Sequence, residues 1–298
     1  MKLTVFTPVY NRRELMGKLY DSLLEQTSHE FVWLIVDDGS TDCVEEDIVN
    51  WKTQAPFDIS YIRQDNQGKH IAHNKAIEAC KTALFVCVDS DDKLLPNAVE
   101  RILEIDQHEI RQDILGYFFR KIDTSGVISG GEFELTSPYV GLRELYHKYN
   151  FKGELVIVLK TKYAKKASFP AFSGERFVSE LVYYNEIDHI APMHWVDDVI
   201  YEYEYQDTGY SKNSNRLISK NPYGTAVGYL SEAKYATKCL QRMKAYAEYL
   251  AICKVFGLDR NRVEYEIQVG NHFVEYKLAW LLMRHYEALF AQIKKGER

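Results

Sequence analysis

Short apolar runs rich in β-branched residues alternate with longer amphipathic stretches through about the first 110 positions of the chain. This alternation is typical of βαβ units, in which buried parallel strands are joined by helices that cover the sheet. The apolar runs predict four strands, at residues 3–7, 31–37, 59–63 and 84–89. We therefore expect an α/β fold, Rossmann-like in this part, with a mostly parallel central sheet flanked by helices.

Helical periodicity fills the intervals between these strands. Leu15, Leu19 and Leu23 repeat at four-residue spacing and predict a helix with one apolar stripe. Pro96 is suited to the first turn of another helix, in which Val99 and Ile102 continue the same spacing. Both stripes predict helices that pack on the sheet.

The pattern changes twice further along the chain. Strand-like and helical segments are mixed after residue 114, and strand signals stop after residue 213. The later segments are expected as strands at 115–122, 155–161 and 199–205, a short helix at 142–149, and long helical stretches at 226–256 and 262–294. We therefore expect two domains, a sheet domain over residues 1–215 and a C-terminal helical region over residues 216–298.

Polar residues follow each of the first four predicted strands. The ligand site of a sheet of this kind lies outside the carboxyl ends of its strands, where loops carry polar groups into a crevice. The four strand ends deliver Thr7-Pro8-Val9-Tyr10-Asn11, Asp37-Asp38-Gly39-Ser40-Thr41-Asp42, Gln64-Asp65-Asn66-Gln67-Gly68-Lys69 and Asp89-Ser90-Asp91-Asp92. The sequence thus predicts that carboxylates and turn residues from four strands meet at one edge of the sheet.

The turn that begins at Asp89 carries the strongest metal-binding signal. Asp89 and Asp91 form a DXD pattern directly after a hydrophobic strand, and clustered like charges need a cation. Oxygen ligands suit Mg²⁺ or Mn²⁺, which usually binds one or two carboxylates together with substrate phosphates. The alternative is an acidic turn that caps the helix near Pro96.

Two other turns are candidates for donor binding. Asp38 stands at the end of the second strand, where a carboxylate can accept hydrogen bonds from a ribose hydroxyl or a base N–H, although Asp-Gly-Ser is also an ordinary turn. Lys69 precedes a helix whose N-terminal N–H groups can meet a phosphate. His70 and His73 lie one helical turn apart, but no third ligand is spaced to join them, and we interpret both as structural.

Composition excludes some classes of partner. The formal net charge of −6 lacks the basic excess that draws proteins to nucleic acid, so no nucleic-acid partner is expected. No stretch approaches the ~20 apolar residues that cross a bilayer, and no signal peptide is visible. The 5 cysteines form no CxxC pair, which favours a reducing compartment. We expect a cytoplasmic protein, with the inner face of the membrane as a further location.

Five motifs, taken in order, resemble family 2 glycosyltransferases of the GT-A fold, and the resemblance covers about residues 1–215. The motifs are Thr7-Pro8-Val9-Tyr10-Asn11-Arg12, Ser22-Leu23-Leu24-Glu25-Gln26-Thr27, Val36-Asp37-Asp38-Gly39-Ser40-Thr41-Asp42, Asn66-Gln67-Gly68-Lys69 to Asn74, and Asp89-Ser90-Asp91-Asp92. Later segments, Gly153-Glu154, Gly174-Glu175-Arg176-Phe177 and Asn221-Pro222-Tyr223-Gly224, are similar to a bacterial subgroup associated with surface polysaccharide synthesis.

The resemblance implies a nucleotide-sugar donor, usually a UDP-sugar, and a glycan, lipid-linked or glycoprotein acceptor. The donor site would comprise Pro8, Tyr10, Asn11, Asp38 and Lys69. Asp89 would face the ribose or the metal, and Asp91 would ligate the Mn²⁺ or Mg²⁺. An acceptor hydroxyl would attack the anomeric carbon with inversion while a carboxylate removes its proton.

The family pattern places that general base in an acidic pair before a helix, and this chain departs from it. Ser179-Glu180 stands where the pair is expected, with Glu175 just upstream. Glu180 is the first candidate for the base and Glu175 the second. Both also fit ordinary surface glutamates, since an acid at a helix N-terminus is electrostatically favoured.

Two other functions stay open. A sugar nucleotidyltransferase also has a Rossmann-like half and acidic metal ligands, but its glycine-rich phosphate loop is missing from the first strand end, where Pro8 and Tyr10 stand. A catalytically degenerate GT-A subunit or scaffold, with the C-terminal helices as its interface, is the non-enzyme alternative. Those helices are also candidates for peripheral membrane contact, around Trp280 and Arg284, or for a homo-oligomer interface.

Overall fold

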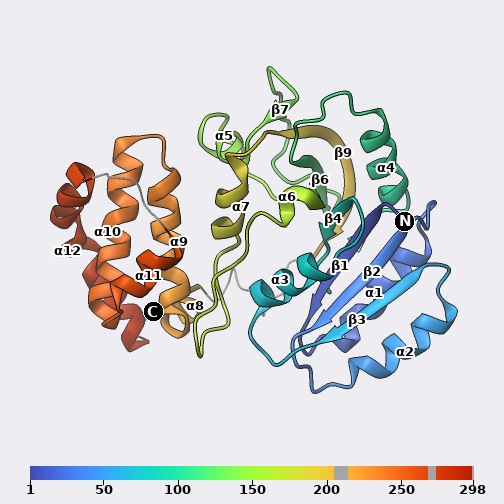
Figure 1. Cartoon of the computed structure of the whole chain (residues 1–298), viewed down its shortest axis with the longest axis horizontal. Helices are drawn as coiled ribbons and strands as arrows, with labels where there is room; N and C mark the ends of the chain where they lie inside the picture. The colour runs from blue at the N-terminus through green and yellow to red at the C-terminus, as the bar shows by residue number, and fades with distance from the viewer. Residues whose placement is uncertain (205–213, 268–272, 297–298) are drawn as a thin grey trace. The chain divides into compact units, whose positions relative to one another are not determined.

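The computed structural model describes residues 1–204, 214–267 and 273–296, and the chain forms two compact units (Figure 1). The sheet unit comprises Met1–Ala167 and Ile187–Tyr205, and the helical unit comprises Ser168–Glu186 and Gln206–Arg298. The sequence suggests a single boundary at residue 215. The structure instead assigns the internal segment Ser168–Glu186 to the helical unit, because that segment is held by long-range hydrogen bonds to helix α9, described below.

One sheet organises the first unit. Its strands are β1 (Leu3–Val9), β2 (Phe31–Asp37), β3 (Asp58–Arg63), β4 (Leu84–Cys87), β5 (Lys93–Leu94), β6 (Gly116–Asp123), β7 (Tyr139–Val140), β8 (Leu155–Lys160) and β9 (Met193–Tyr203). They follow the order β3-β2-β1-β4-β8-β6-β9-β5, and β7 pairs with β9. The pairs among β1 to β4 are parallel, as the apolar runs predict, whereas β8 is antiparallel to both its neighbours. The predicted α/β class with a helix-flanked central sheet is confirmed, and the half of the sheet beyond β4 is mixed.

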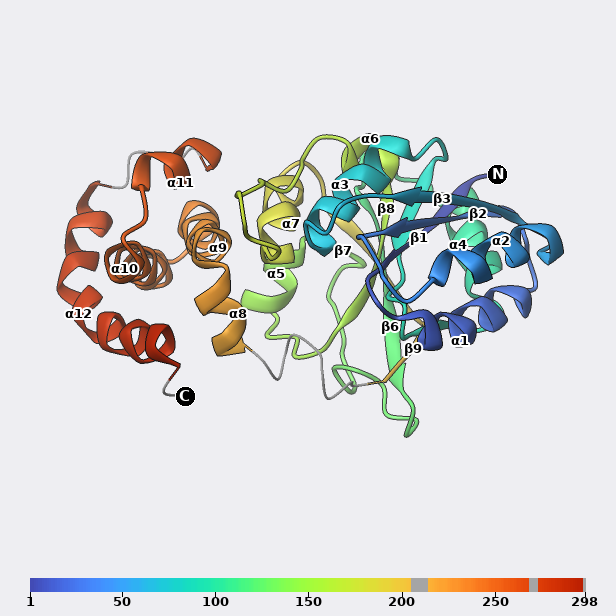
Figure 2. The same ribbon diagram turned by 90° about the horizontal axis from the view of Figure 1, so that it is seen from below.

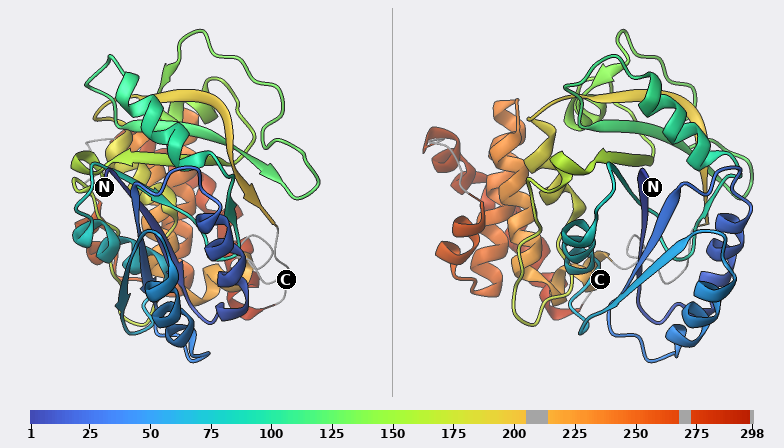
Figure 3. Two further views of the ribbon diagram at one scale, coloured as in Figure 1. Left: turned by 90° about the vertical axis from the view of Figure 1, so that its right-hand side faces the viewer. Right: turned by 45° about the vertical axis from the view of Figure 1, so that its right-hand side comes forward.

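Helices cover both faces of this sheet. They are α1 (Arg13–Leu24), α2 (Val44–Gln54), α3 (Lys69–Ala79), α4 (Ala98–His108), α5 (Leu142–His147) and α6 (Thr161–Ala164). Figure 2 shows α1, α2 and α4 on one side of the sheet and α3 and α6 on the other. Figure 3 shows the same layers from two further directions. The strands β1, β2 and β4 are therefore buried on both faces, which explains why they read as continuous apolar runs, whereas β3, at the edge of the sheet, is only partly buried.

Successive side chains of each strand face opposite sides of the sheet and pack on different helices. Residues at odd positions of β1 and β2, such as Val5 and Trp33, belong to the buried cluster formed with α1, α2 and α4. Tyr20 stacks on both Trp33 and Trp51, with ring centroids 6.1 and 4.6 Å away, and the two indole rings also stack on each other at 5.6 Å. Phe6, at an even position, instead meets His73 of α3 edge-on at 5.8 Å. This packing fixes the strand directions and therefore the positions of their ends.

The register of the sheet brings the carboxyl ends of β1, β2 and β3 together. Val9 lies opposite Asp37, and Asp37 lies opposite Arg63. On the other side of β1, Phe6 lies opposite Cys87, two residues before Asp89. The loops that follow these strands thus begin at the same edge, as the sequence predicts for a parallel sheet.

The helical unit contains α8 (Ser214–Lys220), α9 (Pro222–Tyr235), α10 (Cys239–Phe256), α11 (Arg260–Glu266) and α12 (Phe273–Lys295), and α7 (Glu180–Asp188) crosses the division between the units. The stretch expected at 226–256 is broken, because Ala236 is extended (φ −62°, ψ 126°) and separates α9 from α10. The stretch expected at 262–294 includes residues 268–272, which lie outside the described residues. In the described part of the chain, no helix combines the length and the hydrophobicity that crossing a membrane requires.

Candidate active site at the carboxyl edge of the sheet

Asp37 is fully buried at the end of β2, and the protein itself satisfies its charge. Its Oδ1 accepts a hydrogen bond from the Ser40 N–H at 2.7 Å. Its Oδ2 accepts from the Tyr61 hydroxyl at 2.8 Å and from the Arg63 guanidinium at 2.7 Å. A buried carboxylate needs such partners, and here they lock the turn onto β3. Asp37 is therefore a structural residue of the site.

Asp38, the expected base or ribose ligand, is also buried, with 4% of its surface exposed. Its Oδ1 accepts from the Gln64 side-chain amide and from the Gln67 N–H, both at 2.8 Å. Its Oδ2 accepts from the Gly68 N–H at 2.7 Å. Through these bonds Asp38 fixes the 64–68 loop, which leads into α3.

The N-terminus of α3 was expected to receive a substrate phosphate. The structure places the Asp38 carboxylate directly before this helix, where it accepts hydrogen bonds from the N–H groups of Gln67 and Gly68. A protein anion thus already lies at this helix N-terminus, in agreement with its electrostatic preference, and binding of a phosphate there stays a prediction. Lys69, the first residue of α3, extends its ammonium group elsewhere.

Lys69 reaches the turn after β4. Its Nζ lies 2.7 Å from Oδ1 of Asp89, the first acidic residue of that turn. Arg12, at the start of α1, similarly places Nη1 3.2 Å from Oδ2 of Asp91. The side chains of Asp89 and Asp91 are 38% and 20% exposed, so a ligand can reach both carboxylates. The structure thus brings three of the predicted site residues, Lys69, Asp89 and Asp91, to one place.

The cations around Asp89 set its charge state. Removal from water alone would raise the pKa of Asp89, but the ammonium groups of Lys69 and Lys121 outweigh this effect and hold the pKa below its ordinary value. Asp89 is therefore ionised near neutral pH and available as an anionic ligand.

Asp92 has a different role in the same turn. Its Oδ2 accepts a hydrogen bond from the Tyr201 hydroxyl at 2.7 Å, and its Oδ1 accepts from the Glu204 N–H at 3.3 Å. The same Tyr201 oxygen accepts from the Asp89 N–H at 3.2 Å. Burial raises the pKa of Asp92 to about 6. Asp92 and Tyr201 together fix the turn that presents Asp89 and Asp91.

The loop after β1 contributes Pro8, Tyr10 and Asn11. Pro8 is half-buried, whereas Tyr10 is 44% exposed. Asn11 adopts a left-handed conformation (φ 51°), which asparagine tolerates better than most residues. Its side-chain oxygen accepts from the Thr41 N–H at 2.7 Å, and its own N–H donates to the Ser40 hydroxyl at 3.0 Å. Asn11 therefore ties the first loop to the turn after β2.

Gly39 shows why this turn tolerates no larger residue. It has a positive φ of 80°, which L side chains rarely adopt. A Cβ there would lie 3.0 Å from the Asn66 nitrogen and 3.2 Å from the Gln64 carbonyl oxygen. The turn and the 64–68 loop can approach closely only because this position is glycine.

The carboxylates after β4 have the donor chemistry that a divalent cation requires. Within residues 1–204, 214–267 and 273–296, no group of three His, Cys, Asp or Glu side chains gathers as a protein-only metal site. Mg²⁺ and Mn²⁺ accept fewer protein ligands when substrate phosphates and water complete the shell. The accessible oxygens of Asp89 and Asp91 fit a metal bound in this way, together with a diphosphate.

The two histidines of α3 are structural, as we interpret them from the sequence. His73 packs edge-on against Phe6 and Phe85, with ring centroids 5.8 and 5.5 Å away. Burial lowers the pKa of His70 to about 4, so this ring is neutral at physiological pH.

Glu175, the second candidate for the general base, lies in the helical unit and caps α9. Its two carboxylate oxygens accept from the N–H groups of Tyr223 and Gly224, at 2.8 and 2.7 Å. Next to it, the Arg176 N–H donates to the Asn221 side chain at 2.7 Å. Burial raises the pKa of Glu175 in spite of these bonds. The geometry favours the structural interpretation of Glu175.

Glu180, the first candidate, is the exposed first residue of α7. An acid in the first turn of a helix agrees with the helix dipole whatever its function. Since Ser179 stands where the family pattern has the other acid of the pair, the role of Glu180 as base stays a prediction.

Three residues of the site were not assigned a role from the sequence. Arg12 belongs to the first motif, but its pairing with Asp91 depends on a contact 79 residues away. Tyr201 and Lys121 lie on neighbouring positions of β9 and β6, and the Lys121 ammonium lies 4.4 Å from the Tyr201 ring centroid. The signal available for Lys121 was its charge, next to that of Arg120, in a strand that is otherwise mostly apolar.

The sequence that forms these strand ends matches a known family. The family model described as glycosyl transferase family 2 matches residues 4–162, more than half of the chain. The chain belongs to glycosyl transferase family 2. This confirms the family that the five motifs predict.

A curated relative from Bacillus subtilis, a putative teichuronic acid biosynthesis glycosyltransferase TuaG, is 32% identical over 103 residues, 34% of this chain and 40% of the relative. The segments matched in the first curated relatives span 14 to 40% of those proteins' own lengths.

Two solved structures show the fold. The S. aureus TarS 1-349 complex with UDP-GlcNAc has a TM-score of 0.62 at 17% identity and covers 100% of this chain and 92% of that one. A mannosyltransferase from Pyrobaculum calidifontis, in complex with GDP-Man and Mn²⁺, has a TM-score of 0.52 at 17% identity and covers 100% of this chain and 88% of that one.

Proposed function

We propose that the protein is an inverting glycosyltransferase that moves a sugar from a nucleotide-diphosphate donor to a hydroxyl of a glycan, lipid-linked or glycoprotein acceptor in cell-surface glycan synthesis. One observation carries this proposal. The exposed carboxylates of Asp89 and Asp91 lie beside the cations of Lys69 and Arg12, at the edge where the first strands end. Carboxylates and cations at such a place suit a diphosphate held through a metal.

A UDP-sugar is the proposed donor. Support comes from the UDP-GlcNAc bound in the neighbour with the higher TM-score, 0.62, whereas GDP-Man is bound in the neighbour at 0.52. Surface glycan synthesis is supported by the name of the teichuronic acid relative. The proposed acceptor types follow from the motifs alone.

Asp89 and Asp91 are the proposed ligands of Mn²⁺ or Mg²⁺. When bound, such a metal neutralises the charge that develops on the departing diphosphate. Lys69 and Arg12 already neutralise the two carboxylates and can contribute their positive charge to the phosphates when the donor arrives. Pro8, Tyr10 and Asn11 are the proposed contacts of the base and ribose, on the loop that Asn11 anchors.

Glu180 is the proposed general base. The acceptor hydroxyl forms a bond to the anomeric carbon while the bond from that carbon to the diphosphate oxygen breaks. The hydroxyl proton passes to the Glu180 carboxylate, and the nucleoside diphosphate leaves with the bonding electron pair. A single displacement of this kind inverts the anomeric configuration.

A donor screen tests the proposal. Release of nucleoside diphosphate from a panel of UDP-, GDP- and dTDP-sugars is measured with Mn²⁺, with and without saccharide acceptors. We expect release from one class, mainly UDP, and a loss of about 10²- to 10⁴-fold in Glu180→Gln, the range of a missing general base. Glu175→Gln is the matched control and should keep the turnover of its folded fraction. A folded chain that turns over no donor would favour the catalytically degenerate scaffold instead.

A cytoplasmic location is proposed as well. Its support is that all the cysteines are free, including the exposed Cys43 and Cys239. Solvent-accessible thiols of this kind persist most readily in a reducing compartment. Fractionation of the cells that make the protein tests this location.

A further inference from the structure

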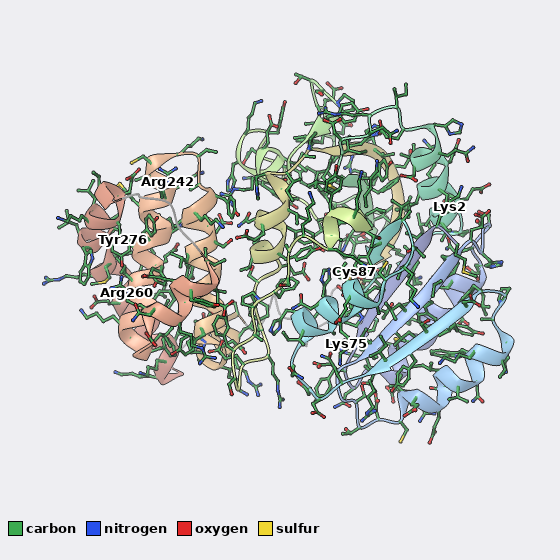
Figure 4. The ribbon with its side chains drawn as sticks, in the orientation of Figure 1. Lys2, Lys75, Cys87, Arg242, Arg260 and Tyr276 are labelled. Carbon is green, nitrogen blue, oxygen red and sulfur yellow. The ribbon has the colours of Figure 1, made fainter. Side chains whose placement is uncertain are left out.

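Helix α12 is held to the helical unit by its inward side. Figure 4 shows Arg242, Arg260 and Tyr276 close together among α10, α11 and α12. Tyr276 packs edge-on against Tyr246 at 5.3 Å and contacts the Arg260 guanidinium. Ala279, Met283, Phe290 and Ile293, which are all buried, continue this side along the helix. The inward side of α12 is thus both apolar and hydrogen-bonded.

The outward side of α12 carries a second apolar stripe that is left exposed by the described part of the chain. Val274, Leu278 and Leu281 follow one another at spacings of four and three residues, which places them on one face of the helix. Their exposed fractions are 65%, 41% and 77%, and the neighbouring Trp280 and Leu282 are 49% and 39% exposed. A helix that shows apolar stripes on two sides needs a partner for the outer one.

The acidic residues of α12 and most of its basic residues lie on different sides of the helix. Both of its acids turn toward α10, where Glu275 pairs with Arg242 and Glu287 pairs with Lys254, each at 2.9 Å. The exposed positions of α12 instead carry the cations of Lys277, Arg284 and Lys295. Among the described residues of this helix, the outer side presents apolar and basic groups without an acid.

The helical unit as a whole also carries a net positive charge. Its segments contain 16 Lys and Arg against 12 Asp and Glu, whereas those of the sheet unit contain 21 against 31. The chain's formal charge of −6 therefore divides into +4 for the helical unit and −10 for the sheet unit. The overall acidity of the chain, which argues against an anionic partner, conceals a basic unit.

We propose that the outer side of α12 docks on a bilayer surface that contains anionic lipid. An amphipathic helix with an apolar stripe on one face and cations beside it lies in the headgroup region, with its apolar stripe among the acyl chains. The exposed Trp280 suits the boundary between the two. Nearby cations add about 1 kcal/mol each on an anionic surface.

Charge also argues against a second copy of the chain as the occupant. Two α12 helices that packed outer side to outer side would bring Lys277 and Arg284 of one copy near the same cations of the other. Among the described residues of α12, the outer side carries no acid that one copy could offer to the cations of the other, so like charges would oppose the dimer. An anionic bilayer complements the same residues.

Vesicle flotation of the full-length protein tests the proposal. The vesicles are phosphatidylcholine alone, or phosphatidylcholine mixed with phosphatidylglycerol, at low and at physiological salt. The variants are Leu278→Gln with Leu281→Gln, and Lys277→Gln with Arg284→Gln. Ile110→Gln is the matched control, since Ile110 is 92% exposed in the sheet unit. Thermal melts show that each variant is folded, which is expected because the changed side chains are exposed.

We expect binding to anionic vesicles that weakens with salt. The leucine variant should bind at least about tenfold less, and the charge variant about fivefold less for each cation removed, while the control binds normally. Absence of flotation with anionic vesicles at low salt overturns the proposal, as does equal binding by the leucine variant. A dimer in light scattering that the leucine variant dissociates would assign this side to a second copy instead. Neither result depends on donor turnover, so the proposed reaction is tested separately.

Discussion

Two acidic turns lie at the same edge of the sheet, and the protein uses them differently. In the turn after β2, Asp37 and Asp38 are 0% and 4% exposed, and neighbouring N–H, hydroxyl and guanidinium groups bind their oxygens. In the turn after β4, Asp89 and Asp91 are partly exposed, and each is paired with a long, flexible cationic side chain. One pair of carboxylates builds the site, and the other is available to a ligand.

The difference shows that the acidic residues of the family motifs are of two kinds: some are needed to fold the site, and others are accessible to a ligand. Asp38 is held by hydrogen bonds to the 64–68 loop, and its contact with the base or ribose of a donor stays a prediction. Asp89 and Asp91 keep oxygens that reach solvent and carry charge that their own fold does not need. Substitutions in the first pair should therefore change stability, and substitutions in the second pair should change activity.

Asp38→Ala should have the largest effect. It leaves the Gln64 amide and the Gln67 and Gly68 N–H groups without their acceptor in a buried place. Breaking a buried, hydrogen-bonded charge costs about 3–5 kcal/mol of unfolding free energy. Urea denaturation followed by circular dichroism measures this loss. A change below 1 kcal/mol, on the scale of about ±0.5 kcal/mol for surface positions, would erase the contrast between the turns.

Asp91→Asn should have the converse effect. The side chain is accessible and its partner Arg12 is 29% exposed, so the unfolding free energy should change by less than about 0.5 kcal/mol. Donor turnover should fall about 100-fold, because metal stabilisation of a leaving diphosphate contributes several kcal/mol and 1.4 kcal/mol is a factor of ten. Steady-state nucleotide release and urea denaturation of the same sample give both numbers. Loss of stability without loss of turnover would reverse the assignment of the two turns.

Acidification should weaken the helix that Asp38 anchors. The His70 pKa is lowered from 6.5 to about 4 by burial, so the unfolded chain binds a proton before the folded one does. Stability is full above pH 6.5 and is lost as the pH falls toward 4, by about 2 kcal/mol at pH 5. Unfolding free energies of wild type and His70→Phe, measured from pH 7 to pH 4.5, isolate the contribution of His70 to the loss of stability. Parallel pH profiles for the two proteins would show that protonation of His70 does not cause the loss.

Glu175→Gln should have the smallest of these effects. It tests a structural carboxylate of the helical unit in the same way. The amide keeps one acceptor for the α9 N–H groups and loses the other along with the negative charge, at a cost of about 1 kcal/mol. Differential scanning calorimetry detects the shift in Tm. A variant with unchanged Tm and abolished turnover would make Glu175 the better candidate for the base.

The strands and their ends could be predicted from the sequence because local patterns define them. The run at 84–88 is apolar since β4 is buried on both faces, and the Asp89 turn follows directly. The same reasoning located Lys69 and Asp91 within the site. Parallel pairing then makes neighbouring strand ends converge whatever the details of the loops.

The partners of the site residues could not be predicted, because they depend on contacts far apart in the chain. Tyr201 meets Asp92 across 109 residues, and Glu175 caps a helix 48 residues later. Residue types alone did not distinguish a carboxylate that binds its own loop, such as Asp38, from one that is open to ligand. The break at Ala236 was missed for a simpler reason, since no glycine or proline marks it.

Isothermal titration of UDP into the wild-type protein and into Asp91→Asn, each with Mn²⁺ or with EDTA, tests the role of the β4 turn most directly. We expect the wild type to bind UDP with Mn²⁺, and the affinity to fall strongly both in EDTA and in the variant. Equal affinity in all four titrations would contradict the assignment of Asp89 and Asp91 to the metal and the diphosphate.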